Sequence, residues 1–279
     1  MTTSPYYFLL LIPILPLCLL FLLFLIVRPR PSRIPIKDRH VFITGGSSGI
    51  GLALARQVAA EGARVSILAR SRKRLEEARE AIRLATGVEV AIFSADVRDA
   101  EEVARAIEEA GPIDVLVCNQ GVFVPQELEK QELEEVKFMV DVNLMGTFHL
   151  IKAALPAMKR RTRETGLPAS ITLMSSQAEQ KRKPELTKII AGSSGGMKAD
   201  DVAKVSLNGI KYGRFIIPCN FEGTMLAIAT SGLSPQSSFM EAFIEVVGAG
   251  FMRLVGLFFQ WNWFSSIEKW QAKSSGKRK

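Results

Sequence analysis

A glycine-rich turn between an apolar strand and an amphipathic helix is the feature that most limits the fold of this chain. The turn GGSSGIG, residues 45–51, follows HVFIT and precedes LALARQVAAEG, whose apolar residues recur at helical spacing. Gly45 and Gly49 would let the backbone approach a pyrophosphate, and Gly51 would let helix and strand pack closely. In this context the turn strongly indicates a dinucleotide-binding fold, whereas a lone glycine-rich turn is weak evidence.

The alternation of strands and helices continues after this turn. The apolar segments 64–70, 88–97 and 113–121 have the composition of buried strands, and helical patterns separate them, the last of which starts after Asp99 as its N-cap. Alternation of this kind predicts a parallel sheet with helices on both faces. The sequence therefore predicts an α/β fold of the Rossmann type, a doubly wound parallel sheet.

The end of the second predicted strand indicates which dinucleotide would bind. An NAD site needs a carboxylate there for the ribose 2′-hydroxyl, but this strand ends in Arg70, and Arg74 follows closely. A guanidinium can pair with a 2′-phosphate, so NADPH is favoured. The alternative is that these are solvated charges, although basic residues at a helix start oppose the helix dipole.

A charge-free apolar segment lies near the N-terminus. Residues 6–27 would cross a hydrocarbon core of about 30 Å as a helix, and membrane helices tolerate the kinks expected at Pro13 and Pro16. A cleaved signal peptide is the alternative, but its basic start and small-residue cleavage site are missing. The basic flank RPRPSR predicts that everything after Val27 faces the cytosol.

Two more apolar segments, 223–233 and 237–264, lie near the C-terminus. Glu241, Glu245 and Arg253 interrupt the second one, so a membrane span requires these charges to pair or to face protein. An interfacial or re-entrant position, with tryptophans at headgroup level, fits the pattern equally well.

Composition argues against several kinds of site. The three cysteines form no CxxC pair and the chain has only two histidines, which argues against a metal centre or a disulfide framework. The net charge of +8 is concentrated in basic clusters beside the apolar segments, without the aromatic interleaving of a nucleic-acid site. We therefore expect no metal, no nucleic acid and a membrane lipid partner.

Five short motifs together resemble those of the short-chain dehydrogenases/reductases: TGGSSGIG, ADV, CNQG, VNLMG and MSSQA. With the anchor and the tail CNFEGTMLAIATSGLSP, the set is most similar to the plant-like 3-ketosphinganine reductases, although CNQG departs from the commoner NNAG. The resemblance covers 41–178 and the chain from about 183 onward. It implies NADPH-dependent reduction of 3-ketosphinganine, a long-chain 3-ketosphingoid base, to sphinganine in sphingolipid biosynthesis. It also implies an enzyme anchored in the endoplasmic reticulum membrane, facing the cytosol, and a possible homo-oligomer.

The resemblance also implies roles for individual residues. Asn143 would support a proton relay, and one serine of the pair Ser175 and Ser176 would orient the substrate, with Ser176 favoured by register. The implied cofactor-binding residues are Gly45, Ser47, Ser48, Gly49, Gly51, Arg70, Arg74, Asp96, Val97, Asn119 and Gly121.

The catalytic Tyr-x-x-x-Lys of the family is missing. In the register set by Ser176, the tyrosine and lysine positions hold Ile189 and Ser193. Two of the three tyrosines lie in the N-terminal apolar segment, and Tyr212 has no lysine four residues later, so we interpret Tyr212 as a helix-end packing residue.

A whole segment is absent around these positions. Residues 179–188 lead directly to a predicted late helix and late strand within 200–219. The helix and strand expected before them would take about thirty residues. The chain is therefore either a reductase by family resemblance or an inactive isoform or mis-spliced product that retains nucleotide binding only.

The predicted fold is a Rossmann-type sheet that is truncated after the fifth strand, which would leave apolar surface and an open sheet edge. An N-terminal transmembrane helix and a C-terminal membrane-associated region accompany it. The predicted parts are a membrane anchor (1–27), a basic linker (28–38), an NADP-binding domain (39–222) that is incomplete after 177, a membrane-associated region (223–270) and a basic tail (271–279).

Overall fold

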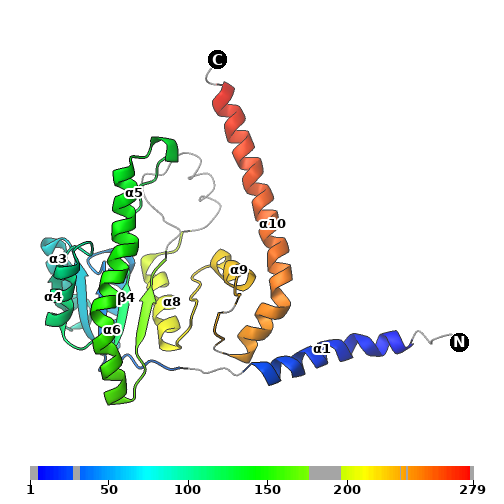
Figure 1. Cartoon of the computed structure of the whole chain (residues 1–279), viewed down its shortest axis with the longest axis horizontal. Coiled ribbons are helices and arrows are strands. Elements are labelled where there is room, and N and C mark those ends of the chain that lie inside the picture. The colour runs from blue at the N-terminus through cyan, green and yellow to red at the C-terminus, as the bar shows by residue number, and fades with distance from the viewer. Residues whose placement is uncertain (1–5, 28–31, 176–195, 233, 237, 277–279) are drawn as a thin grey trace. The chain divides into compact units, whose positions relative to one another are not determined.

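The computed structural model describes residues 6–27, 32–175, 196–232, 234–236 and 238–276. The chain divides into two compact units (Figure 1). The first comprises Met1–Ser32 with Gly213–Ser265, and the second comprises Arg33–Tyr212 with Ser266–Lys279. Each unit is described by itself below.

The second unit is built on a five-stranded parallel sheet of order β3-β2-β1-β4-β5. β1 is fully buried, as its uninterrupted run of apolar and small residues predicts for a central strand covered on both faces. This confirms the predicted Rossmann-type fold. The strands are β1 (His40–Thr44), β2 (Arg64–Ala69), β3 (Ala91–Ser94), β4 (Val115–Cys118) and β5 (Ser170–Leu173).

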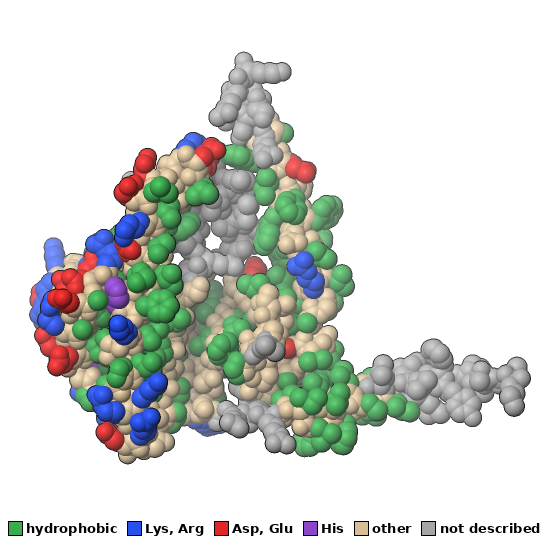
Figure 2. Space-filling model, in the orientation of Figure 1, with side chains coloured by type: hydrophobic (Ala, Val, Ile, Leu, Met, Phe, Trp, Pro, Cys, Tyr) green, Lys and Arg blue, Asp and Glu red, His purple; other side chains and the backbone are tan. Residues whose placement is uncertain are grey.

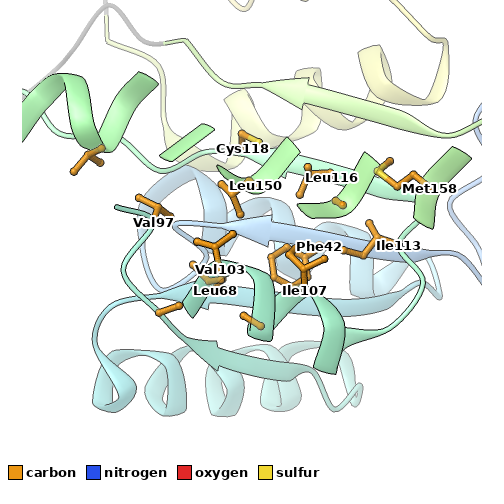
Figure 3. Close-up of a cluster of buried hydrophobic side chains, with 14 residues drawn as sticks. Phe42, Leu68, Val97, Val103, Ile107, Ile113, Leu116, Cys118, Leu150 and Met158 are labelled. Atoms are coloured by element: carbon orange, nitrogen blue, oxygen red, sulfur yellow. The ribbon is translucent and has the colours of Figure 1, made fainter. Parts of the chain in front are cut away.

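Helices cover both faces of this sheet. On one face, Val103 and Ile107 of α4 and Leu150 of α6 pack over Phe42 and Leu116 of the central strands (Figure 3). α2 packs against α3 and α8. Asp99 caps α4 as predicted, since its carboxylate accepts hydrogen bonds from the backbone N–H groups of Glu101 and Glu102. The helices are α2 (Gly49–Ala60), α3 (Arg72–Thr86), α4 (Ala100–Ala110), α5 (Leu133–Val140), α6 (Gly146–Thr165) and α8 (Ala199–Lys211).

The late strand predicted within 200–219 does not form, and that prediction was wrong. The late helix is present as α8, but residues 213–220 have no strand conformation. A strand needs a hydrogen-bonded neighbour, and no strand follows β5 in the part of the chain that the structure describes. The pattern of the late strand is therefore present without the neighbour that would let it join the sheet.

The edge of the sheet and one helix expose apolar side chains. Leu173 at the end of the edge strand β5 is 59% exposed. Leu144, Met145 and Phe148, around the start of α6, are also exposed. Figure 2 shows hydrophobic side chains on the face of the molecule that carries α6. Native monomers rarely leave extended patches of this kind uncovered.

A buried ionic cluster at the amino ends of β1 and β4 holds α6 to the sheet. Asp114 accepts hydrogen bonds from Arg161 of α6 and from the backbone N–H of His40, at 2.8 Å for the latter. Arg39 Nη2 lies 3.0 Å from Asp114 Oδ1, and both side chains are nearly inaccessible to solvent. In the sequence, Arg39 is the last member of the basic cluster after the N-terminal apolar segment, which we expected to face lipid headgroups. The structure instead buries Arg39 against Asp114, because a charge inside the protein requires a partner.

His40 belongs to the same cluster and is held neutral. Its Nε2 lies 2.7 Å from Ser66 Oγ, and its Nδ1 lies 2.7 Å from Arg64 Nη2, which can only donate, and 2.8 Å from Pro112 O, which can only accept. Burial lowers the pKa of His40 to about 4, and the nearby Arg64 adds to this effect against the opposing influence of Pro112 O and Asp114. The imidazole therefore accepts a proton far less readily in the folded chain than in the unfolded chain.

The remaining helices are strongly apolar, and they lie in the first unit except for residues 266–276 of the last one, which belong to the second unit. They are α1 (Tyr6–Ile26), α9 (Phe221–Ala229) and α10 (Phe239–Gly276). By length and composition, residues 239–270 could cross a membrane. The helical stretch 133–165 passes the same test, yet Leu150 within it belongs to the hydrophobic core, so the test by itself does not show membrane contact.

Two of the charges that interrupt α10 have partners within this unit. Arg214 Nε lies 3.6 Å from Glu241 Oε1, and Gln236 donates a hydrogen bond to Glu245. Arg253 is exposed on α10. Pairing lowers the cost of bringing Glu241 and Glu245 near lipid, which was the condition for a membrane span.

We predict that protonation of His40 destabilises the second unit in mild acid. The unfolded chain takes up this proton near pH 6.5 and the folded chain only near pH 4, so the free energy of unfolding falls as the pH falls through this window. His40 alone should contribute a loss of about 3 kcal/mol between pH 7 and pH 4. A His40→Asn variant, which cannot titrate there, should lose correspondingly less.

Reaction of the buried Cys118 thiol with dithiodipyridine at increasing urea concentration would report unfolding of this unit. Cys118 is 3% exposed, and burial raises the pKa of its thiol to about 12, so it should react only after unfolding. Parallel pH profiles for the wild type and His40→Asn would contradict the prediction.

Candidate nucleotide-binding site

The turn between β1 and α2 has the geometry of a phosphate cradle. Gly45 and Gly49 have φ angles of +62° and +57°, a region that favours glycine. A Cβ at Gly51 would lie 2.3 Å from Gly45 O, so only glycine allows this close approach of helix and strand. A Cβ at Gly49 would meet nothing within 4 Å, because this side of the turn is open.

The start of α2 leaves hydrogen-bond donors free for an anion. The Ser48 side chain makes no capping hydrogen bond, although it occupies the N-cap position. Ser48 is exposed and Ser47 is half-buried. The first N–H groups of a helix have no partner within the helix, and the helix dipole favours negative charge at this end. The open turn and the start of α2 therefore form a favourable environment for a phosphate.

Asn119 and Thr44 join the carboxyl ends of β1 and β4 beside this cradle. The Thr44 hydroxyl accepts a hydrogen bond from Asn119 N at 2.9 Å, and Asn119 Nδ2 donates to Thr44 O at 3.1 Å. Asn119 Nδ2 also lies close to Gly51, since a Cβ there would come within 2.5 Å of it. Asn119 thus holds the two strands and the phosphate turn together.

Asp96 and Val97, which follow β3, face different surroundings. The Asp96 carboxylate is partly exposed, and its hydrogen bonds with Arg98 are the main reason that its pKa is lowered. The Val97 side chain is buried, and a Cβ at Gly146 would lie 2.7 Å from its Cγ2. Asp96 can therefore offer its side chain to a ligand, whereas Val97 can offer only its backbone.

Arg70 and Arg74, at the start of α3, carry exposed positive charges. No ion pair involves either residue among the residues described. The neighbouring Arg72 is different, because its Nε lies 3.0 Å from Glu76 Oε1. Ser71 caps α3 by accepting a hydrogen bond from Arg74 N. Arg70 lies near enough to Asp96 to lower the pKa of that carboxyl group, yet two exposed guanidinium groups beside a helix N-terminus still favour an additional phosphate.

A π-helical turn, residues Asp141–Met145, contains the candidate relay residue Asn143. Asn143 Oδ1 accepts from Val122 N and Asn143 Nδ2 donates to Val122 O, each at 2.8 Å. A Cβ at Gly121 would lie 3.7 Å from Asn143 Oδ1. Single π turns inside helices are frequent at functional sites. Asn143 is thus held beside the segment that leaves β4.

The candidate catalytic serines lie at the edge of what the structure describes. Ser175 follows β5 and is exposed. Ser176, Ile189 and Ser193 lie outside the described residues, so their geometry adds nothing to the site.

Tyr212 lies far from the phosphate turn. It caps the C-terminal end of α8, and the Arg33 guanidinium lies over its ring, 5.6 Å from the centroid. The preceding residue, Lys211, bonds to Glu61 at the C-terminal end of α2, at 2.9 Å. Because α2 starts in the phosphate turn and its 12 residues span about 18 Å, Tyr212 is not within hydrogen-bond reach of a ligand there.

Sequence reasoning missed three residues that organise this site. Gln120 Nε2 donates to Thr147 Oγ1 at 2.8 Å, and the Thr147 hydroxyl donates to Asn143 O at 2.9 Å. Gln120 Oε1 also accepts a hydrogen bond from Thr44. The departure of CNQG from NNAG was the available signal for Gln120. Arg98, which binds the Asp96 carboxylate, belongs to no motif that the sequence analysis could have used to predict this contact.

Comparison with known proteins identifies the relatives of this chain. The short chain dehydrogenase family matches residues 39–191. The 3-dehydrosphinganine reductases TSC10A and TSC10B of Arabidopsis thaliana are 54% and 52% identical to it. These alignments cover 88% and 92% of this chain and 90% and 92% of the relatives. A metagenomic short-chain oxidoreductase crystallised with NADP has the same fold, with a TM-score of 0.51, 23% identity and coverage of 63% of this chain and 91% of that chain.

The lengths of these alignments show that the relatives have residues at positions where this chain has none. The alignment with TSC10A extends over 297 positions, yet 88% of the 279 residues of this chain is only about 246. About 50 positions of the alignment therefore have no residue in this chain.

Proposed function

Because this chain belongs to the short-chain dehydrogenase family, we propose that it is a form of the NADPH-dependent reductase that converts 3-ketosphinganine to sphinganine in sphingolipid biosynthesis. The identity of 54% to a 3-dehydrosphinganine reductase, over 90% of that relative, is the observation that carries this proposal. The chain in this form retains nucleotide binding but lacks the group that completes the reduction.

The nucleotide-binding part of this proposal rests on the site before β5. The phosphate turn would hold the pyrophosphate, and Arg70 and Arg74 would pair with the 2′-phosphate. Asp96 would accept a hydrogen bond from the adenine edge. Asn119 and Gly121 would support the strand end beside the cofactor. These side chains and turns fit such a ligand because the cradle at Gly49 is open and both arginines are exposed.

The step for which this chain lacks a residue is the transfer of a proton to the ketone oxygen. Bound NADPH supplies a hydride for the ketone carbon, and the protein must then give a proton to the oxygen. A phenol does this efficiently near neutral pH when a neighbouring positive charge lowers its pKa from about 10. Tyr212 stands instead at the far end of α2, beside Arg33. We infer that the 50 or so missing positions include the tyrosine and the lysine, since Ile189 and Ser193 stand where the register set by Ser176 expects them.

We further propose that the first unit anchors the protein in the endoplasmic reticulum membrane, with the second unit in the cytosol. The support is the charge-free α1, the apolar α10 and the basic flank after Val27. Such an anchor would keep the site close to a long-chain substrate that stays in the bilayer. Protease added outside sealed microsomes should therefore cut within residues 40–220, and full protection of this region would disprove the orientation.

We predict that the chain binds NADPH at least about tenfold more tightly than NADH, because a charge-assisted pair with a 2′-phosphate contributes about 1.5–3 kcal/mol. Arg70→Asp should remove this preference by repelling the phosphate. Arg83→Asp changes charge equally near the other end of the same helix and should leave the preference intact. Fluorescence titration of full-length chain in detergent measures all three proteins. Equal affinity of the wild type for both nucleotides would refute the assignment.

We predict that this chain has no measurable 3-ketosphinganine reductase activity. General acid catalysis commonly contributes about 10² to 10⁴-fold, and the lost segment would also position the substrate. The control is a restored variant that carries, between Gln177 and Pro184, the segment of TSC10A that this chain lacks. The chain and the restored variant are both assayed with NADPH and 3-ketosphinganine. The restored variant should turn over, and both proteins should bind NADPH. Turnover by the short chain within tenfold of the restored one would contradict the prediction and make Tyr212→Phe the next variant.

A further inference from the structure

Arg98 donates hydrogen bonds to both carboxylate oxygens of Asp96, from its guanidinium and from its backbone N–H. Arg98 Nε lies 3.1 Å from Asp96 Oδ1 and 3.0 Å from Oδ2, and Arg98 Nη2 lies 2.6 Å from Oδ2. The backbone N–H of Arg98 also donates to Oδ1, at 3.0 Å. A planar guanidinium that binds both oxygens of a carboxylate fixes its rotation as well as its position. Asp96 therefore has one orientation at the carboxyl end of β3.

Arg98 also interacts with Phe138 of α5 and with Asp141. Its guanidinium lies over the ring of Phe138, 5.2 Å from the centroid, and it is attracted by Asp141. Phe138 belongs to α5 and packs against the hydrophobic core, and Asp141 begins the π turn that contains Asn143. Arg98 thus bridges the end of β3 and the helix that leads to the π turn.

The backbone of Asp96 is restrained as well. Its N–H donates to Glu102 Oε2 of α4 at 2.8 Å. The carboxylate has acceptor capacity beyond the bonds that Arg98 makes, since two ionised oxygens offer about four lone-pair sites. The side chain is 24% exposed, so a ligand can reach it. An amino group that approaches Asp96 therefore meets a carboxylate that is already oriented.

We propose that Arg98 is a positioning residue for base recognition: it presents the Asp96 carboxylate to the 6-amino group of the adenine of a bound dinucleotide. This inference rests on the proposed binding of NADPH. Arg98 does not contact the base itself. Its effect is to remove the cost of ordering Asp96 when the nucleotide binds, which is how preorganisation increases affinity.

A reduced NADP analogue with hypoxanthine in place of adenine separates this role from a general structural one. The analogue has an oxygen where adenine has its 6-amino group, so it cannot donate a hydrogen bond to Asp96 from that position. Fluorescence titration of the full chain in detergent should show about a tenfold preference for NADPH over the analogue, as expected for a hydrogen bond to a charged acceptor. Arg98→Ala should reduce this preference to less than threefold and change the affinity for the analogue less than twofold.

Three variants complete the test. Arg98→Lys keeps the charge but loses the planar fork, and it should restore only part of the preference. Arg83→Ala removes a guanidinium with a similar bidentate grip, on Glu80, at an exposed site of α3, and it should change neither affinity. In an Asp96→Ala background, Arg98→Ala should have no further effect on the preference, because the group that it positions is gone. An unreactive Cys118 thiol shows that each variant is folded.

The outcomes separate this inference from the proposed nucleotide binding. Equal losses of affinity for both nucleotides in Arg98→Ala would show a purely structural role and overturn the inference. An unchanged preference in Arg98→Ala would overturn it too. A wild type that binds both nucleotides equally would overturn base recognition by Asp96 while leaving nucleotide binding standing. Binding of neither would overturn the proposed binding, and this inference with it.

Discussion

A parallel sheet requires a hydrogen-bonded neighbour for each strand and cover on both of its faces, and this requirement governs how much of the chain folds. β1 meets it completely, since it pairs with β2 and β4 and all of its residues are buried. β5 pairs with β4 alone, and Leu173 at its end is largely exposed. The residues after α8 have a strand-like pattern but remain outside the sheet, and the described residues contain no strand beyond β5 with which they could pair.

The two ends of the sheet differ in what their residues do. The carboxyl ends of the strands form the candidate nucleotide site, where Thr44 and Asn119 hold the phosphate turn against β4. The amino ends hold the buried cluster around Asp114, which ties α6 to β1 and β4. Changes in the cluster should therefore act mainly on stability, and changes at the site mainly on binding. This separation follows from the fold, since parallel strands place all their carboxyl ends at one edge.

If the proposed function is correct, this chain keeps the residues that bind the nucleotide and lacks those that complete the reduction. Every candidate contact with the cofactor lies before β5, in the part of the sheet whose strands have their neighbours. The expected tyrosine and lysine would follow β5, and Ile189 and Ser193 stand at those positions in the register set by Ser176. A protein of this kind would hold NADPH and remain in the membrane without reducing a ketone.

The sequence by itself determined the features that depend on neighbouring residues. The glycine turn, the strand and helix alternation and the Asp99 cap were predictable, because backbone conformation and capping are set within a few residues. Only the tertiary structure decided which side chains meet. It buried Arg39 on Asp114, placed Arg98 between Asp96 and Phe138, and joined Gln120 to Thr147. It also kept the late strand out of the sheet. These outcomes depend on contacts between residues far apart in the chain, and local sequence patterns carry no information about which distant group will be near enough to bond.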